Sequence, residues 1–328
     1  MGGDPADNAI EVQDLHKTHP GGVKALRGLS FTVAAGEVFA LLGPNGAGKS
    51  STVRILTTLS APTRGRARVA GFDVVEQPQE VRRRIGYVAQ TSGVDPLTTG
   101  RENLELQCRI FRLPTDEARR RIDEILNLLQ LEEVAERLVK TYSGGMQRRL
   151  DIAMGLIPQP EVLFLDEPTT GLDPHSRAVM WQEIQRFAGQ GLAILLTTHY
   201  LEEADKLADR LMIIDRGQVI TEGSPDELKG RLRGDVVTIE LEDAERVEEA
   251  REQVNRVEGI HRVLVDGSEL FAQTAHGASA VPAVAATLEK AGISMVQISL
   301  SRPSLDDVYL NATGHAFRSA GGPAEASS

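Results

Sequence analysis

The sequence predicts an α/β protein of two domains. The larger is built on a mixed core sheet with an antiparallel β-subdomain and an inserted helical subdomain, and the smaller is α+β. Three observations predict this fold. The runs Val38–Leu42, Val162–Leu165 and Ala193–Thr198 are apolar almost throughout, as strands buried on both faces of a parallel sheet are. Between about 101 and 157, apolar residues recur at helical spacing. Near Gly234 the strand pattern starts again, which indicates a second domain.

Length and charge limit the possible functions. The 328 residues suffice for two domains with a core each. The net charge of the chain is −11. The segment from Asp235 onward has 15 acidic and 7 basic residues and so contributes −8 of this charge. Such an acidic chain is unlike a nucleic-acid-binding protein, whose affinity comes from clustered Lys and Arg. The single cysteine, Cys108, excludes internal disulfides. No apolar run approaches the roughly 18 residues that span a bilayer. We therefore expect no nucleic-acid partner and no direct insertion into a membrane.

The first domain is expected over 10–232, after a disordered N-terminus at 1–9. Two alternating segments, 10–15 and 23–33, predict antiparallel strands joined by a turn at 20–22. A helical subdomain is expected at about 95–160. The remaining expected elements are a strand ending near Val69, a strand at Ile85–Ala89, helices at Pro174–Ala188 and Leu201–Leu207, and a hairpin at Arg210–Glu222.

The second domain is expected over 233–316, followed by a disordered tail at 317–328. Its pattern is strand, helix, strand, strand, helix, strand, which is the ferredoxin-like order. The expected elements are Val236–Leu241, Ala244–Val257, Ile260–Val265, Glu269–Thr274, Ala280–Ala291 and Ile293–Leu300, with a short helix at Ser304–Leu310 after them. Dimerisation or regulation is its expected role.

A glycine-rich loop separates the strand Val38–Leu42 from a helical segment that begins near Thr52. Its spacing, G-x-x-x-x-G-K-[ST], is that of a phosphate-binding loop, in which glycines let several backbone N–H groups point at one anion. We expect Lys49 to reach the β- and γ-phosphates of a nucleoside triphosphate and Ser50 to ligate Mg²⁺. The expected cofactors are ATP and Mg²⁺, and the expected binding residues are Gly43, Pro44, Asn45, Gly46, Ala47, Gly48, Lys49, Ser50 and Ser51.

Two carboxylates, Asp166 and Glu167, follow directly on a buried strand. In a chain that already has a phosphate loop, an aspartate at this position is expected to hold the shell of Mg²⁺, and the next glutamate to polarise an attacking water. We therefore expect Asp166 to serve the metal and Glu167 to be catalytic.

A second anion cradle is predicted where Tyr142, Ser143, Gly144 and Gly145 begin a helix, because a serine hydroxyl and backbone N–H groups gather there. With this motif the chain resembles the nucleotide-binding subunits of ATP-binding cassette (ABC) transporters. Their signature is Leu-Ser-Gly-Gly-Gln; here Tyr142 replaces the leucine and Met146 the glutamine. The resemblance implies that Ser143, Gly144 and Gly145 close on ATP held by a second copy of the chain.

The same resemblance, which covers about 10–228, implies roles for three more residues. Gln90 corresponds to a glutamine that touches Mg²⁺ and senses the transmembrane partner. Asp173 lies in a loop that crosses the dimer interface. His199 corresponds to the histidine that contacts the γ-phosphate, so it joins Lys49 and Glu167 in the expected catalytic set.

One position departs from the family pattern. The family stacks the adenine on an aromatic residue, commonly tyrosine, about two dozen residues before the phosphate loop, and His19 lies there instead. An imidazole stacks with less area, so a weaker adenine contact is expected. A turn histidine without a role is the alternative.

A narrower resemblance, to daunorubicin-resistance-type ATPases of drug exporters, extends over nearly the whole chain. It depends on the segments 99–104, 142–146 and 303–310. It implies a homodimer at the cytoplasmic side of the cell membrane, attached through a separate multi-span permease, that energises efflux of drugs or other hydrophobic compounds. An importer ATPase with an effector-sensing C-terminal domain and a soluble ABC ATPase without a transport role are the alternatives.

Overall fold

The computed structural model describes residues 8–232 and 234–313. The segments 1–7 and 317–328, for which we expected disorder, lie outside the described residues. The chain forms two compact units, of which the first ends at Val219 and the second begins at Ile220. This division comes earlier than the expected boundary between 232 and 233, so that helix α8 (Pro225–Arg231) falls in the second unit.

The central sheet has six strands in the order β10-β9-β3-β8-β7-β6, and the boundary between Val219 and Ile220 falls within β10. Neighbouring strands from β9 through β6 are parallel. Every residue of β3, β7 and β8 is buried, as their apolar sequences predict. The strands are β3 (Val38–Leu42), β6 (Ile85–Val88), β7 (Val162–Asp166), β8 (Ala193–Thr198), β9 (Arg210–Asp215) and β10 (Gln218–Gly223).

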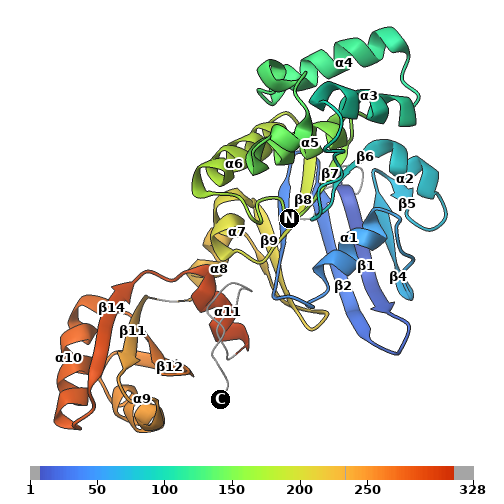
Figure 1. Cartoon of the computed structure of the whole chain (residues 1–328). Helices are drawn as coiled ribbons and strands as arrows, with labels where there is room; N and C mark the ends of the chain where they lie inside the picture. Colours follow the sequence, from blue (N-terminus) through green and yellow to red (C-terminus); the bar gives the residue numbers. More distant parts are fainter. Residues whose placement is uncertain (1–7, 233, 314–328) are drawn as a thin grey trace. The chain divides into compact units, whose positions relative to one another are not determined.

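A second sheet, in the order β2-β1-β4-β5, forms the antiparallel β-subdomain (Figure 1). It shares one hydrophobic core with the central sheet: the rings of Phe31 in β2 and Phe39 in β3 stack with centroids 5.0 Å apart. β1 already starts at Asn8, within the segment for which we expected disorder. The elements are β1 (Asn8–Thr18), β2 (Lys24–Ala34), β4 (Arg64–Val69) and β5 (Phe72–Asp73), with α1 (Lys49–Leu56) and α2 (Pro78–Arg84).

The inserted helical subdomain is present where the helical spacing predicted it. Figure 1 shows α3, α4 and α5 at one end of the sheet. Thr99 and Glu102 form a reciprocal capping box that starts α3, and Ser143 caps α5. The helices are α3 (Gly100–Ile110), α4 (Thr115–Leu128) and α5 (Gly144–Leu156), followed beyond the insertion by α6 (Pro174–Gly189) and α7 (Leu201–Leu207).

The second unit has the sheet order β12-β13-β11-β14 with antiparallel pairing, which is the ferredoxin-like topology that the sequence predicted. Several boundaries differ by one to three residues; the second expected helix, for example, begins at Gly277 and not at Ala280. The first expected helix opens with a 3₁₀ turn at Ala244–Arg246, and β14 starts two residues late, because Ile293 N–H still bonds Leu288 O at the end of α10. The elements are β11 (Asp235–Leu241), α9 (Val247–Asn255), β12 (Ile260–Asp266), β13 (Glu269–Thr274), α10 (Gly277–Lys290), β14 (Met295–Ser301) and α11 (Leu305–Thr313).

Within 8–232 and 234–313, no helix has both the length and the apolar character needed to cross a membrane.

Candidate nucleotide site

The phosphate loop leaves β3 at the carboxyl edge of the central sheet and leads into α1. Gly46 and Gly48 have φ values of +81° and +114°, a region that favours glycine. Gly43 is required for a different reason: a Cβ there would lie 2.2 Å from the carbonyl oxygen of Ile214 in β9. At Gly43 the loop therefore packs against the sheet with no room for a side chain, and at Gly46 and Gly48 its backbone curls as an anion cradle must.

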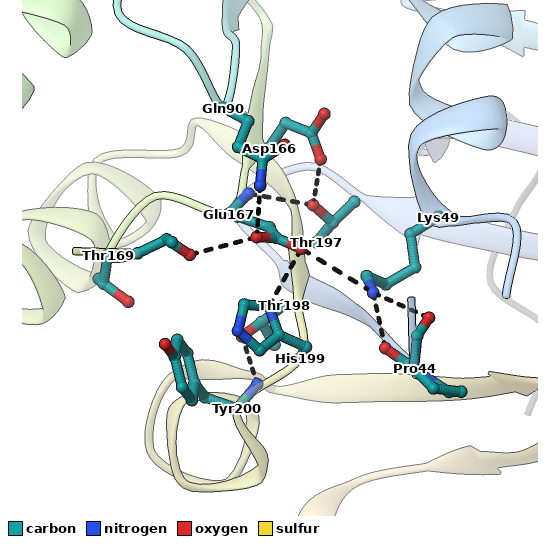
Figure 2. A network of polar contacts seen from close by, with 12 residues as sticks. Pro44, Lys49, Gln90, Asp166, Glu167, Thr169, Thr197, Thr198, His199 and Tyr200 are labelled. Carbon is teal, nitrogen blue, oxygen red and sulfur yellow. Dashed lines mark hydrogen bonds and ion pairs between the residues drawn. The ribbon is translucent and has the colours of Figure 1, made fainter. Parts of the chain in front are cut away.

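Lys49 begins α1, and its side chain is only 5% exposed. Its Nζ donates hydrogen bonds to the carbonyl oxygens of Gly43 (2.6 Å) and Pro44 (3.3 Å), and it lies 4.0 Å from Oε1 of Glu167 (Figure 2). Burial lowers the pKa of Lys49, while the charges of Glu167 and Asp166 oppose that shift. The ammonium is thus held at the loop, near the carboxylates of Asp166 and Glu167 at the end of β7.

Asp166 is the last residue of β7 and is buried. Its Oδ1 accepts a hydrogen bond of 2.5 Å from Oγ1 of Thr197 at the end of the neighbouring strand β8. Burial raises the pKa of Asp166, and the hydrogen bond from Thr197 opposes the shift. The sequence analysis missed Thr197. The position of this threonine, near the end of an apolar strand and shortly before His199, could have indicated a polar side chain at the site.

Glu167 receives contacts from several separate elements of the unit. Its Oε2 accepts hydrogen bonds from Nε2 of Gln90 (2.9 Å) and Oγ1 of Thr170 (3.2 Å). Nδ1 of His199 lies 3.1 Å from Oε1, close enough for an ion pair but without hydrogen-bond alignment. With Lys49, three of the residues selected from the sequence thus surround one carboxylate; Figure 2 shows them pointing toward it. Thr170 was missed.

Glu167 also has an unusual backbone, with φ at +48°. Its N–H bonds both the carbonyl oxygen and Oγ1 of Thr197, each at 3.1 Å. A left-handed glutamate of this kind costs about 1–3 kcal/mol and persists only where neighbours enforce it. The extended backbone of β7 therefore ends at Asp166, and Glu167 begins the turn that follows the strand.

A pocket of about 500 Å³ lies over the phosphate loop. His19 lines it, with Nε2 3.2 Å from Oγ of Ser51. Val23 and Lys24, which directly follow the predicted turn at 20–22, also line it and were missed. The exposed fraction of Val23, 64%, is high for an apolar side chain. The remaining lining residues are Ala25, Pro44, Asn45, Gly46, Gly48, Lys49, Ser50, Ser51, Gln90 and Glu167.

The second predicted cradle is built separately. Oγ of Ser143 accepts the N–H of Met146 at 3.3 Å, so it caps α5, and Asp173 caps α6 by accepting from the N–H and hydroxyl of Ser176. A Cβ on Gly145 would lie 2.7 Å from Oγ of Ser176. Ser143, Gly144, Gly145 and Asp173 do not line the pocket over the phosphate loop, so one copy of the chain does not combine the two cradles there.

Comparisons with known proteins agree with this architecture. Residues 26–170 match the ABC transporter family, and residues 223–313 match the C-terminal domain of DrrA1-3-like ATP-binding proteins. The chain is 46% identical to the daunorubicin resistance ATP-binding protein DrrA3 of Streptomyces coeruleorubidus, over 94% of this chain and 97% of that protein. It belongs to the ABC transporter ATP-binding proteins. This ABC protein is also 44% identical to the doxorubicin resistance ATP-binding protein DrrA of Mycobacterium tuberculosis (94% of each chain) and 37% identical to the Nod factor export ATP-binding protein I of Ralstonia nicotianae (94% and 95%).

Solved structures carry the same cassette. An ATP-binding subunit of an ABC transporter superposes with a TM-score of 0.61 at 30% identity, over 68% of this chain and 92% of that one. A dimeric bacterial ABC transporter cassette gives 0.59 at 28% identity, over 66% and 98%. The expected fold and family are confirmed, and the chain is an ABC-type ATPase that binds and hydrolyses ATP.

Proposed function

We propose that this ABC ATPase powers the efflux of drugs or other hydrophobic compounds through a separate membrane permease. The observation that carries the ATPase part of the proposal is the convergence of Gln90, His199 and Lys49 on the carboxylate of Glu167. The efflux part is supported by the relatives, which are named for daunorubicin or doxorubicin resistance and for Nod factor export. Those names favour export over the importer alternative.

The triphosphate of ATP would lie in the phosphate loop, with the adenine toward His19. Backbone N–H groups of the loop residues that follow Pro44, together with the start of α1, would bind the phosphates. Lys49 would exchange its bonds to the carbonyl oxygens of Gly43 and Pro44 for the β- and γ-phosphates. The pocket over the loop supports this placement, since His19, Ser50, Ser51 and Glu167 all line it.

The donor set around the loop fits Mg²⁺. This ion prefers oxygen ligands and takes one or two carboxylates together with substrate phosphates and water. Ser50 offers an exposed hydroxyl, Gln90 an amide oxygen, and Asp166 a carboxylate oriented by Thr197. When bound, Mg²⁺ would neutralise charge on the β- and γ-phosphates.

Hydrolysis would depend on Glu167 as the group that orients and polarises the attacking water. Gln90 and Thr170 hold its carboxylate, and His199, whose Nδ1 lies 3.1 Å from that carboxylate, would contact the γ-phosphate. Lys49 would stabilise the charge that develops on the transferred phosphoryl group. Gln90 lies just after β6, Glu167 directly after β7 and His199 directly after β8, so the central sheet positions all three side chains.

We propose that the working form is a homodimer in which Ser143, Gly144 and Gly145 of one copy close over ATP bound by the other, with Asp173 at the interface. The separation of the two cradles within one chain supports this, as do the dimeric cassettes among the solved relatives. In this proposal the dimer docks on its permease at the cytoplasmic side of the cell membrane. The second unit would stabilise or regulate the dimer.

Glu167→Gln tests the proposal most directly. The amide retains the size of the side chain but is a poor base, so ATP binding should stay within about threefold while turnover falls by two orders of magnitude or more. Dimers should accumulate with ATP, measured by size-exclusion chromatography with light scattering. Full turnover in this variant would refute the assignment. Drug accumulation in cells that express the permease, with and without Lys49→Ala, tests the efflux part.

A further inference from the structure

Arg148 lies on α5, the helix capped by Ser143, and its side chain is buried, with 7% exposed. Its guanidinium donates four hydrogen bonds, all to backbone carbonyl oxygens. Nε bonds Pro168 (2.8 Å) and Nη1 bonds Ala89 (2.7 Å), while Nη2 bonds Asp166 (3.1 Å) and Glu167 (3.3 Å). A buried cation that loses these partners is strongly disfavoured, so the bonds fix the backbone around it.

These carbonyl groups belong to the two segments that carry the candidate chemistry. Ala89 directly precedes Gln90, and the other three frame Glu167. Asp151, one turn further along α5, accepts the N–H of Gly93 at 2.9 Å. The loop that carries Gln90 is therefore tied to α5 on both sides.

The turn after β7 is held from a second direction. Glu203 of α7, only 1% exposed, accepts hydrogen bonds from Oγ1 of Thr169 (2.7 Å) and Nε1 of Trp181 (3.1 Å). Arg148 thus contacts the turn from one helix, and Glu203 contacts its next residue from another. The left-handed backbone of Glu167, with φ at +48°, lies inside this double support.

We infer that Arg148 is a positioning residue that sets the places of Gln90 and Glu167 by fixing their backbones to α5. Ser143 caps the same helix. Arg148 therefore links the cradle that is proposed to face a partner copy to the catalytic residues of its own chain. This inference rests on the proposed function of Glu167. It also gives α5 a role besides its N-terminal motif.

The test compares Arg148→Gln and Arg148→Lys with Arg149→Gln in the full-length protein. A glutamine amide reaches about as far as Nε and loses the bonds to Ala89, Asp166 and Glu167, whereas lysine keeps the charge. Arg149, the next residue, bonds Leu129 O, away from the site, and is the matched control. The measurements are steady-state ATP hydrolysis, ATP affinity by equilibrium titration, and thermal unfolding.

We expect Arg148→Gln to lower kcat at least tenfold, while KM and ATP affinity stay within about threefold of the wild-type values. Arg148→Lys should recover part of the lost kcat. In the control, Arg149→Gln, kcat should stay within about twofold of the wild-type value. In a folded variant, an unchanged kcat, or a rise in KM alone, would overturn the inference. If both Arg148 variants unfold, Asp151→Ala decides. It removes the buried carboxylate whose Oδ2 lies 3.9 Å from Nη1 of Arg148, and it frees the Gly93 end of the loop, so both the guanidinium and the loop lose a support. An unchanged kcat then overturns the inference, and a fall in kcat at constant KM supports it.

A comparison with Glu167→Gln separates the two proposals. If Glu167→Gln is inactive and the Arg148 variants turn over normally, only the positioning role fails. If Glu167→Gln turns over normally, the proposed function fails instead. Combining Arg148→Gln with Glu167→Gln should add less than a threefold loss, because both act through one carboxylate; a fully multiplicative loss contradicts the positioning role.

Discussion

The hydroxyl of Tyr142 occupies the space where a side chain on Gly100 would start: a Cβ there would lie 2.4 Å from Oη. Tyr142 stands where the family signature has leucine, and its hydroxyl donates a 2.6 Å hydrogen bond to Val134 O. Gly100 is the first residue of α3. The tyrosine is therefore accommodated by a glycine in another helix of the same subdomain.

Gly100→Ala should destabilise the protein by about 1–3 kcal/mol, because the new methyl group forces Tyr142 to move and to give up its bond to Val134. Urea unfolding of the single variants, Gly100→Ala and Tyr142→Phe, and of the double variant measures the coupling. Removing the hydroxyl also removes the clash, so the double variant should be less destabilised than the sum of the two. Additive losses would show that the two residues do not conflict.

Mixing two inactive variants tests whether the cradles act across a dimer. In a mixed dimer of Lys49→Ala and Ser143→Ala, one site contains both defects and the other contains neither. Half of the dimers in an equimolar mixture are mixed, so about a quarter of wild-type ATP hydrolysis should return if the two sites act independently. Each variant mixed with itself is the control. If activity does not return although the subunits exchange, Ser143 does not act on the partner's ATP.

His19→Ala should weaken ATP binding by about three- to tenfold, because a ring that stacks on a base contributes roughly 1 kcal/mol. Tripolyphosphate binding should stay unchanged, since it has no base. Equilibrium titration of both ligands distinguishes stacking from an effect on the loop through Ser51. His16→Ala is the matched control, because His16 contacts Asp14 and does not line the pocket over the loop. Equal losses for both ligands would argue against stacking.

The raised pKa of Asp166 predicts how stability depends on pH. Burial raises this pKa above its ordinary value of 3.8. At pH values between the ordinary and the raised pKa, the folded state therefore binds more protons than the unfolded state. The free energy of unfolding falls as the pH rises through this range. Asp166→Asn cannot titrate. In the absence of nucleotide, the free energy of unfolding of Asp166→Asn should therefore exceed that of the wild type near neutral pH by on the order of 1 kcal/mol.

Urea unfolding between about pH 4 and pH 8 measures this difference. Asp173→Asn supplies a contrast of opposite sign, because hydrogen bonds from Ser176 lower the pKa of Asp173 and its carboxylate adds stability as the pH rises. Parallel pH profiles for the two variants would contradict the role of burial at Asp166.

Sequence reasoning predicted the candidate site from segments whose local chemistry is specific. Three local signals mark positions at one edge of a parallel sheet: a glycine spacing, two carboxylates at the end of an apolar strand, and a histidine after the next strand. Lys49, Glu167 and His199 could therefore be predicted to lie together before the fold was known. Boundaries were less secure: the turn that ends α10 delays β14 to Met295, because hydrogen bonds at a helix end depend on local geometry.

The sequence by itself determined the phosphate loop, the order of strands and helices in both units, and the residues whose chemistry suits ATP hydrolysis, because each depends on neighbours along the chain. Only the tertiary structure decided that Arg148 bonds the backbones around Gln90 and Glu167, that Thr170 and Thr197 complete the polar network, and that Tyr142 faces Gly100. These contacts join residues on separate elements, and their partners are often backbone carbonyl groups, which every residue possesses and no sequence pattern marks.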